Sequence, residues 1–489
     1  MATYKSLNNF ATIKMPNQRE KFGSRLGFIL AAAGSAVGIG NLVGFPVNAA
    51  KSGGAAFLLV YAFFIVVICL PVMMAEMSLG RHTQRNPLGA YNSVSGGNPL
   101  WKIGGWLALI TPFMIAVFYQ VLTVWLLAYF VGAVSGNLAQ MADPAFFGTF
   151  INGPSVFGYL AVLTVVIGFV LNSGVQNGIE RLAKALMPTL FVMLIILTIF
   201  VLTLPNALVG VKYYLIPDLS KINPEVVSNA LGQAFFSLSL GMGILITYGS
   251  YVSRKESIAG GAKMVALVDT SVAFFAGLLI LPAIFVFNPA TDTSELSSSS
   301  VSLVFTFLPK IFLSLQSLIG YVGASAFAAT FFLLVFFAAL TSQVSILQVP
   351  LSAFQDELKF SRVKSVLSLG ACAILLVLAC TVSFGMVTYF TEFTSYGGAT
   401  KSFFDIVIDV FYDTILPLNG LIICLFAIFH WKKANLNAEL AIGDDKFEGS
   451  FTQKYVNGAL GTVIPLVLLL VFVNTVCIKF FGFSLTDYM

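Results

Sequence analysis

Eleven long apolar runs, separated by short polar connectors, constrain this chain more than any other feature of its sequence. Each run holds the roughly 20 mainly apolar residues that a helix needs to cross the hydrocarbon of a bilayer. The runs lie at residues 24–50, 54–79, 104–134, 154–174, 185–205, 228–252, 261–288, 322–358, 363–388, 402–431 and 455–481. Of the 489 residues, 58% are hydrophobic and 10% are charged, which is too much apolar surface for a soluble core. We therefore predict an all-α polytopic membrane protein with eleven spans in a single membrane domain, residues 1–489.

The basic residues predict how these spans are oriented. If the N-terminus is cytoplasmic, 6 of the 26 Lys and Arg residues lie outside and 20 lie inside. The six outer residues are Lys51, Lys212, Lys221, Lys310, Lys401 and Lys479. This split favours a cytoplasmic N-terminus under the positive-inside rule, and an odd number of spans then puts the C-terminus outside. The outer loops contain no N-x-[ST] sequon, so we expect the inner (plasma) membrane of a bacterium.

Composition argues against several classes of function. The chain has no basic tract or aromatic-basic platform, so we expect a lipid bilayer but no nucleic acid among its partners. All five cysteines fall inside apolar runs, which disfavours disulfides and CxxC metal sites. Only His82 and His430 are histidines, and neither HExxH nor GxSxG occurs. We predict that the protein is not an enzyme and holds no organic cofactor.

Two of the predicted spans contain clusters of small and polar residues at mid-membrane. The first carries Gly-Ser-Ala-Val-Gly-Ile-Gly-Asn at 34–41, and the sixth carries Ser-Leu-Ser-Leu-Gly-Met-Gly at 237–243. Glycines four residues apart commonly mark close helix packing, which is one interpretation. The other is a pair of broken helices, because interrupted spans at matching positions of two halves indicate an inverted-repeat transporter. On this interpretation the first repeat is 24–205, the second is 228–431, and span 11 at 455–481 follows them.

Acidic residues within or at the edge of the apolar runs form a second signal. They are Glu76, Asp269, Asp405, Asp409 and Asp413. A charge at mid-membrane costs about 2.5–3.5 kcal/mol on insertion scales, so such residues usually have a partner. We assign Glu76 a structural role, in which it accepts hydrogen bonds from the unpaired N–H groups of a broken helix. Asp269 lies deep and has no basic residue in its own helix, which favours a bound cation as its partner.

Span 8 contains two adjacent hydroxyl side chains, Thr341 and Ser342. Together with backbone carbonyls they can complete a site for a small, hard cation. Hydroxyls in a membrane helix also commonly bond to their own backbone, so this alternative stays open.

Three stretches carry a family resemblance. They run from Arg19 through Gly38-Ile-Gly-Asn41 to Phe45-Pro46, from Gln233 to Gly241, and from Phe337 to Ser342. On these residues the chain resembles the neurotransmitter:sodium symporter family, whose LeuT fold is a 5+5 inverted repeat with broken helices 1 and 6. An eleventh span resembles several bacterial members. The resemblance implies sodium-coupled uptake of an amino acid by alternating access, by a monomer or a weak dimer.

The resemblance also implies two sodium ions and the residues that bind them. The first site takes the Ala36 carbonyl, Asn41, Ser237, Asp269 and the substrate carboxylate. The second takes the carbonyls of Gly34, Val37 and Ala338 with the hydroxyls of Thr341 and Ser342.

For the substrate, the resemblance implies that Tyr119 binds the carboxylate. The full set of substrate-binding residues is Ala36, Gly38, Gly40, Ile115, Tyr119, Phe236, Ser239, Met242, Ser342 and Ile346. Gly38 stands where amine-transporting relatives carry an acid, so the substrate is expected to bring its own carboxylate. Because Met242 is flexible and flanked by glycines, we expect a hydrophobic or aromatic L-amino acid. A different small carboxylate or amine osmolyte, or a substrate-sensing receptor of the same fold, is the alternative.

Departures from the family pattern give two further expectations. Asp269 stands where chloride-dependent members have Asn, so a fixed carboxylate replaces the anion and transport should be independent of chloride. Gly44 stands where many relatives have Arg or Lys, so Asp409 should lack its usual partner. The outer gate should then close through Phe236 and Tyr119, or through water.

The inner gate follows the family pattern more closely. It is expected to pair Arg19 with Asp356, beside Tyr251.

Overall fold

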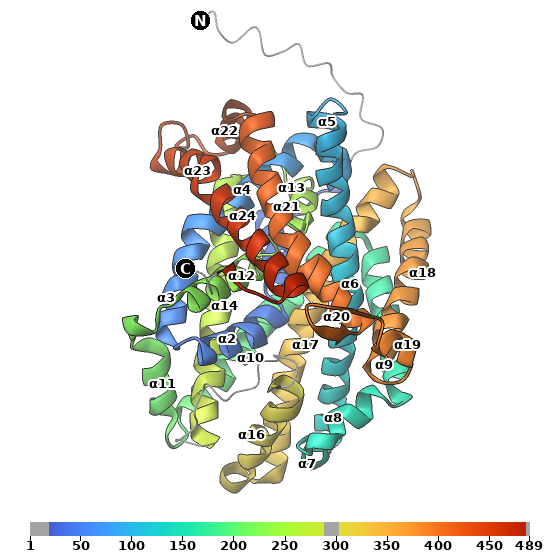
Figure 1. Cartoon of the computed structure of the whole chain (residues 1–489), viewed down its shortest axis with the longest axis vertical. Coiled ribbons are helices and arrows are strands. Elements are labelled where there is room, and N and C mark those ends of the chain that lie inside the picture. Colours follow the sequence, from blue (N-terminus) through green and yellow to red (C-terminus); the bar gives the residue numbers. More distant parts are fainter. Residues whose placement is uncertain (1–18, 288–302, 486–489) are drawn as a thin grey trace, which may run out of the picture.

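Helices make up most of the computed structural model, which describes residues 19–287 and 303–485 (Figure 1). Lys5 and Lys14, which contribute to the charge argument above, lie outside the described residues. Within the described ranges, nine helices are long and apolar enough to cross a membrane, and one bent pair of shorter helices makes a tenth candidate.

The first helix of the bent pair is α1 (Arg25–Ala36). The second is formed by η1 (Gly40–Gly44), which continues directly into α2 (Phe45–Lys51). The second to fifth predicted spans comprise α3 (Ala55–Phe64), η2 (Ile65–Cys69) and α4 (Leu70–Thr83); α6 (Pro99–Val134); α9 (Ser155–Asn172); and η3 (Val175–Glu180) with α10 (Arg181–Leu202). The sixth to ninth comprise α12 (Pro224–Ser237) with α13 (Ile244–Gly249); α14 (Ile258–Phe287); α17 (Gln316–Asp356); and α18 (Arg362–Thr381) with η7 (Val382–Phe384). The last two comprise α20 (Phe403–Val407), η8 (Ile408–Ile415), α21 (Leu416–Leu425) and η9 (Phe426–His430); and α23 (Phe451–Gly461), α24 (Val463–Val476) and η10 (Cys477–Phe481).

Short elements connect the long helices at the two ends of the molecule. They are α5 (Pro87–Val94), α7 (Leu138–Met141), α8 (Pro144–Ile151), α11 (Ala207–Leu215), η4 (Leu219–Lys221), η6 (Leu303–Phe307), α16 (Leu308–Ser314), α19 (Thr388–Thr391), α22 (Lys433–Ala441) and the hairpin β1 (Thr394–Tyr396) and β2 (Ala399–Lys401). In Figure 1, α5, α22 and α23 lie at the upper end, and α7, α8, α11 and α16 lie at the lower end. We call these the α5 end and the α16 end.

Several helices extend beyond the apolar run that predicted them. The helix α6 begins at Pro99 rather than at residue 104, and α17 begins at Gln316 rather than at residue 322. Hydropathy detects only the part of a helix that crosses hydrocarbon, and polar turns at its ends escape it. The kink in α17 lies at Gly320, whose φ of 73° interrupts the helix.

The first span is broken where the glycine cluster predicted it. Ser24 caps α1 by accepting a hydrogen bond of 3.0 Å from the Gly27 N–H, and the helix ends at Ala36. The chain then turns by 54° before it continues through η1 and α2. Because a helix leaves its last four carbonyls without an intrahelical partner, the break sets free acceptors in the middle of the molecule.

The sixth span is broken between Ser237 and Ile244. Gly241 and Gly243 have positive φ angles of 74° and 65°, which glycine adopts without strain, and Ser239 has a φ of 54°. The freed backbone of Gly241 has partners on two other helices. Its N–H donates to Glu76 Oε1 at 2.8 Å, and its carbonyl accepts a hydrogen bond of 2.9 Å from the Asn419 amide.

Other glycines bring two helices into direct contact. A Cβ on Gly80 of α4 would overlap the carbonyl oxygen of Ile246 in α13, and a Cβ on Gly249 would overlap that of Met77. Close packing through small residues therefore holds α13 against α4. The glycines in the first break do not bring helices into contact in this way. They leave room for side chains from other helices that reach the break.

Candidate functional site

Three buried polar residues meet between the two breaks. The Asn41 amide donates to Ser237 Oγ at 2.8 Å and to Asp269 Oδ1 at 2.7 Å. The Ser237 hydroxyl in turn donates to Asp269 Oδ2 at 2.8 Å. These side chains come from η1, α12 and α14, and each residue is at most 1% exposed. The structure thus brings together the three side chains predicted for the first sodium site.

The carboxylate of Asp269 has hydrogen-bond donors around it but no cation. Tyr61, which is fully buried, donates to Ser237 Oγ at 3.1 Å and lies 3.4 Å from Asp269 Oδ2. Within residues 19–287 and 303–485 no ion pair involves Asp269. A buried charge without a counter-charge is costly, so this place attracts a cation.

The carbonyls at the end of α1 converge on Ser342 of α17. The Ser342 Oγ atom lies 3.4 Å from the Gly34 carbonyl and 3.1 Å from those of Ser35 and Val37. Ser239 donates to the same Ser35 carbonyl at 3.1 Å. The sequence analysis did not assign Ser35, because only the fold shows which carbonyls of the break face α17.

Thr341 bonds to its own helix, as one of the two interpretations above expected. Its hydroxyl lies 3.0 Å from the Ala338 carbonyl and 3.1 Å from that of Phe337. A Cβ on Gly34 would lie 3.5 Å from Thr341 Cβ, so Thr341 also faces the broken helix. A hydroxyl that donates its hydrogen keeps lone pairs for a cation, so both interpretations fit this geometry.

Tyr119 of α6 reaches the first break. Its hydroxyl accepts a hydrogen bond of 3.1 Å from the Ile39 N–H. A Cβ on Gly38 would lie 2.6 Å from Tyr119 Oη and 2.9 Å from Ser342 Oγ. Only glycine therefore leaves room for both hydroxyls. The other apolar residues of the expected pocket, Ile115, Met242 and Ile346, are at most 3% exposed.

Phe236 covers the break from the other side, and its ring partner is one that the sequence analysis missed. A Cβ on Gly40 would lie 2.7 Å from the Phe236 ring. Tyr412 of η8 packs edge-on against Phe236 with ring centroids 4.4 Å apart. Tyr119 makes its ring contact with its neighbour Phe118, at 6.5 Å. Nothing in the sequence around Tyr412 distinguishes it from the other aromatic residues of the predicted spans, so its contact with Phe236 could not be predicted.

Asp409 has no basic partner at Gly44, as expected, but two lysines from other elements pair with it. Lys479 Nζ lies 2.8 Å from Asp409 Oδ1, and Lys401 Nζ lies 3.2 Å from Asp409 Oδ2. The cations come from η10 and from the hairpin rather than from the broken first span. At Gly44 the neighbouring side chain is Gln233, whose Oε1 would lie 3.4 Å from an added Cβ.

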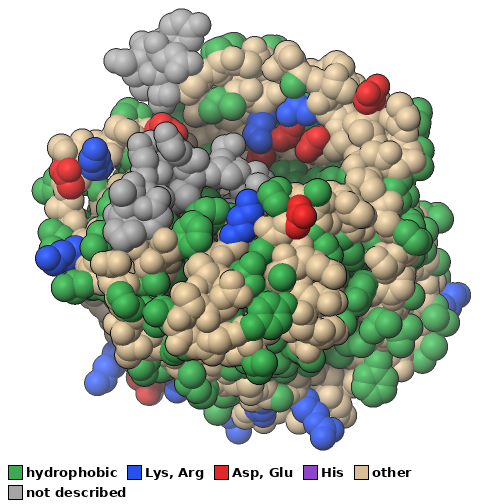
Figure 2. Space-filling model, turned by 90° about the horizontal axis from the view of Figure 1, so that it is seen from below, with side chains coloured by type: hydrophobic (Ala, Val, Ile, Leu, Met, Phe, Trp, Pro, Cys, Tyr) green, Lys and Arg blue, Asp and Glu red, His purple; other side chains and the backbone are tan. Residues whose placement is uncertain are grey.

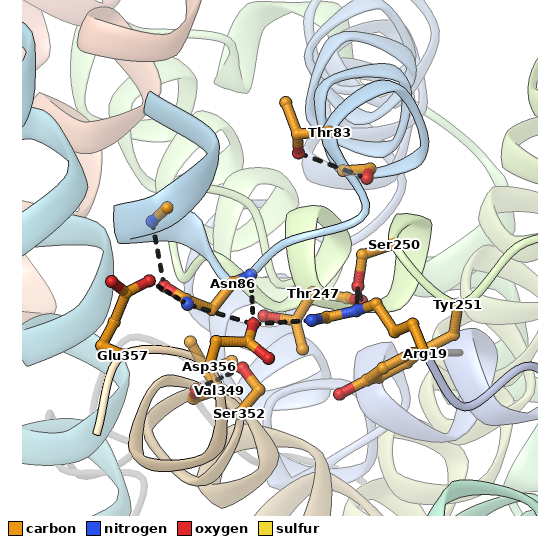
Figure 3. Close-up of polar contacts among 12 residues, drawn as sticks. Arg19, Thr83, Asn86, Thr247, Ser250, Tyr251, Val349, Ser352, Asp356 and Glu357 are labelled. Carbon is orange, nitrogen blue, oxygen red and sulfur yellow. Dashed lines mark hydrogen bonds and ion pairs between the residues drawn. The ribbon is translucent and has the colours of Figure 1, made fainter. Parts of the chain in front are cut away.

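At the α5 end the structure brings together the predicted pair Arg19 and Asp356, which lie 2.6 Å apart (Figure 3). Arg19 Nε donates to Ser250 Oγ at 2.8 Å, and the guanidinium lies 4.9 Å from the centre of the Tyr251 ring. Asp356 also accepts hydrogen bonds from Asn86, at 2.9 Å from its backbone N–H and at 3.1 Å from its side chain. Asn86 caps α5, so the gate joins the N-terminal segment to α5, α13 and α17.

Two further carboxylates hold the N-terminal segment at this end, and the sequence analysis missed both. Glu20 pairs with Arg362 at 3.2 Å and accepts a hydrogen bond of 2.7 Å from the Val175 N–H. Glu180 accepts one of 2.7 Å from the Gly23 N–H. The partners are more than 150 residues apart in the chain, so no local pattern reveals them.

Comparison with known proteins decides the class of protein. The model of the sodium:neurotransmitter symporter family matches residues 19–143 and 153–433, which is most of the chain. The chain belongs to this family. Its members are transporters rather than enzymes, so this symporter is a multi-pass, sodium-dependent membrane transporter.

Relatives of this symporter carry the same general description. It is 32% identical over 467 residues to an uncharacterized sodium-dependent transporter, YhdH, of Bacillus subtilis, covering 94% of this chain and 98% of the relative. It is 25% identical to a sodium- and chloride-dependent taurine transporter of Bos taurus, covering 60% of this chain and 55% of the relative.

A solved structure supports the predicted fold. The crystal structure of MhsT in complex with L-phenylalanine superposes on this symporter with a TM-score of 0.80 at 38% identity, covering 93% of this chain and 99% of MhsT. The LeuT fold expected from the sequence is therefore confirmed.

Proposed function

We propose that this symporter takes up an L-amino acid with a hydrophobic or aromatic side chain, together with two sodium ions, by alternating access. The observation that carries the proposal is the Asp269 carboxylate, which is fully buried among hydrogen-bond donors and forms no ion pair within the described residues. A sodium ion would supply the missing positive charge, and the carboxylate of a substrate would complete the ligands of that ion. The solved neighbour MhsT, which binds L-phenylalanine, supports the substrate class.

The first sodium ion is proposed to bind Asp269, Asn41, Ser237 and the Ala36 carbonyl. In the structure the Asn41 amide nitrogen faces Asp269, so ion binding requires this amide to turn its oxygen inward. The second ion is proposed to bind the carbonyls of Gly34, Val37 and Ala338 with the hydroxyls of Thr341 and Ser342.

The substrate is proposed to lie against Tyr119 and the two breaks. Gly38 contributes no carboxylate, so an amine without its own carboxylate would leave the sodium ion short of a ligand. The resulting contact between substrate carboxylate and sodium couples the two fluxes directly. Ala36, Gly40, Ile115, Phe236, Ser239, Met242, Ser342 and Ile346 complete the proposed pocket.

We also propose that transport is independent of chloride, because Asp269 supplies a fixed negative charge next to Tyr61 and Ser237. The charge distribution supports a cytoplasmic α5 end and an outer α16 end in a bacterial inner membrane. With a membrane potential of 100 mV and a tenfold sodium gradient, two ions supply roughly 7 kcal/mol, enough for about 10⁵-fold accumulation.

Uptake into reconstituted vesicles tests this proposal. With sodium outside, radiolabelled L-phenylalanine should accumulate and saturate, and potassium in place of sodium should abolish uptake. Replacing chloride by gluconate should change nothing. Taurine is the comparison substrate, because it carries a sulfonate instead of a carboxylate and one relative is described as a taurine transporter. Sodium-dependent uptake of taurine without uptake of any hydrophobic amino acid would contradict the proposed substrate class.

The inner gate gives a prediction of its own. Arg19→Ala removes the 2.6 Å ion pair with Asp356 and the 2.8 Å hydrogen bond to Ser250. Because these contacts close the α5 end, we expect uptake against a gradient to fall at least tenfold, while sodium-dependent binding of L-phenylalanine falls less. Parallel uptake and equilibrium binding assays measure the difference. Lys102→Ala, at the same end, is the control and should transport normally; equal losses in uptake and binding for Arg19→Ala would argue against a gate.

A further inference from the structure

Four charged side chains and a tyrosine meet at the α16 end. Lys479 Nζ lies 2.8 Å from Asp409 Oδ1 and 2.7 Å from Asp413 Oδ2, and Lys401 Nζ lies 3.2 Å from Asp409 Oδ2. The Tyr396 hydroxyl donates to Asp409 Oδ2 at 2.9 Å. Figure 2, viewed from the α16 end, shows acidic and basic side chains together at the rim of a hollow. We call these five residues the charge cluster.

The hairpin explains why two members of the charge cluster point the same way. Gly397 and Gly398 have positive φ angles of 60° and 78°, which form the tight turn between β1 and β2. Tyr396 pairs with Ala399, so Tyr396 and Lys401 emerge on the same face of the hairpin. The Tyr396 ring also stacks on Phe480 of η10 at 5.1 Å. The hairpin is therefore seated on the end of the eleventh span.

The two carboxylates come from a π-helical segment, η8. Asp409 and Asp413 are four residues apart and both face Lys479. A π-helical stretch is rare and occurs frequently at functional sites. The residue before Asp413 is Tyr412, whose ring packs on Phe236 at 4.4 Å. The two carboxylates of the charge cluster and the tyrosine that packs on Phe236 therefore belong to one short segment.

From Phe236 the contacts lead directly into the proposed substrate site. Phe236 lies against Gly40 in the first broken span, as the 2.7 Å approach to an added Cβ shows. Gln233, one turn earlier in α12, donates to the Gly40 carbonyl at 2.9 Å. Movement of η8 away from α12 would therefore free the Phe236 ring, which lies over this part of the break.

Burial makes the charge cluster stronger than a surface ion pair but leaves it open to water. The Asp409 side chain is 5% exposed, whereas those of Lys401 and Lys479 are 23% and 31% exposed. Partly desolvated pairs interact more strongly than exposed ones, yet water can replace their contacts when the groups separate. Burial and the neighbouring Asp409 carboxylate raise the pKa of Tyr396, so its hydroxyl keeps the hydrogen that it donates.

We propose that the charge cluster is the latch of the outer gate, in which Lys479 and Lys401 fix η8 to span 11 and to the hairpin in the position where Tyr412 packs on Phe236 over the substrate site. The latch gives span 11, which lies outside the predicted 5+5 repeat, a part in the transport cycle. This inference rests on the proposed transport function, because an outer gate must open only in a transporter that works by alternating access. Its test, however, requires no substrate.

Thiol accessibility in the full-length protein tests the latch. The parent carries Cys372→Ala and Cys477→Ala, which remove the cysteines that are not buried, and Ser239→Cys, a near-isosteric reporter at a residue that is 5% exposed. A membrane-impermeant methanethiosulfonate reagent is added to spheroplasts in sodium buffer without amino acid. We expect Lys479→Gln to raise the labelling rate at least threefold, and Lys401→Gln combined with Lys479→Gln to raise it at least tenfold.

Matched variants separate a latch from a structural support. Lys479→Arg should keep the parental rate because it keeps the charge, and Lys212→Gln removes an exposed lysine at the same end and should also leave the rate unchanged. If Lys479→Gln folds poorly, Tyr396→Phe removes a single hydroxyl and should raise labelling about twofold. Parental labelling rates in Lys479→Gln or Tyr396→Phe, with or without a lower melting temperature, would overturn the latch.

A second arm keeps failure of the latch apart from failure of the proposed function. L-phenylalanine with sodium should protect the reporter in the parent. If L-phenylalanine fails to protect the reporter, the proposed substrate class is contradicted. The labelling rates measured without amino acid test the latch separately.

Discussion

Asp269→Asn should lower the sodium affinity of this symporter at least 100-fold and make the remaining transport respond to chloride. The substitution keeps the size of the side chain and removes its charge. Breaking one side of a buried ionic contact costs about 3–5 kcal/mol, which is roughly 10²- to 4 × 10³-fold in affinity. Asn41 and Ser237 both donate to the carboxylate, so the amide nitrogen of the new side chain would also face a donor.

Chloride dependence is the specific part of this prediction. Once the fixed carboxylate is gone, an anion beside Tyr61 and Ser237 can restore the missing charge. Sodium titrations of L-phenylalanine uptake, each in chloride and in gluconate, measure both effects. The control is Asp143→Asn, an exposed helix cap that Asn can replace. Unchanged sodium dependence in Asp269→Asn, indifferent to chloride, would remove Asp269 from the sodium site.

Gly38→Ala should lower substrate affinity about 10- to 100-fold without unfolding the protein. The new methyl group would lie 2.6 Å from Tyr119 Oη and 2.9 Å from Ser342 Oγ, closer than carbon and oxygen normally approach. Overpacking of this kind costs about 1–3 kcal/mol. Both hydroxyls belong to the proposed site, so the cost falls on binding, and equilibrium binding of L-phenylalanine in sodium measures it.

A second glycine gives the matched control. Gly168 lies in α9, and an added Cβ there would have nothing within 4 Å. Gly168→Ala should leave binding unchanged and raise the melting temperature slightly, because Ala favours helix over Gly by about 1 kcal/mol. In a double variant, Tyr119→Phe added to Gly38→Ala removes Tyr119 Oη, the oxygen nearer to the new methyl group. This change should relieve part of the steric overlap. Normal binding by Gly38→Ala would show that the break has more room than the structure indicates.

Some residues of the candidate site could be predicted from the sequence and others could not. The break at 34–41 was visible because glycine and a polar residue at mid-membrane are unusual, and the structure brings Asn41, Ser237 and Asp269 together as the resemblance implied. Ser35 was missed because the resemblance implies only the neighbouring carbonyls of Gly34 and Val37, and no side-chain pattern shows that the Ser35 carbonyl also faces Ser342. Glu20 and Glu180 were missed because they look like ordinary charged residues at helix ends.

Asp409 shows the same limit. The Gly44 position correctly predicts that the usual basic partner is absent, but it does not reveal the two lysines that take its place. Lys479 is 70 residues away and Lys401 reaches Asp409 only because two glycines turn the hairpin. A missing partner in the usual place therefore gives no information about partners from other elements.

The membrane location of this chain, the course of its helices and the two breaks could all be predicted from the sequence. These properties depend on the apolar content and backbone preferences of neighbouring residues, which add up locally along the chain. The Ser35 carbonyl that faces Ser342, the ring that covers Phe236 and the cations that hold Asp409 appear only in the folded molecule. Such contacts join separate helices, and their partners are set by how the helices pack and where their polar groups can be satisfied away from lipid.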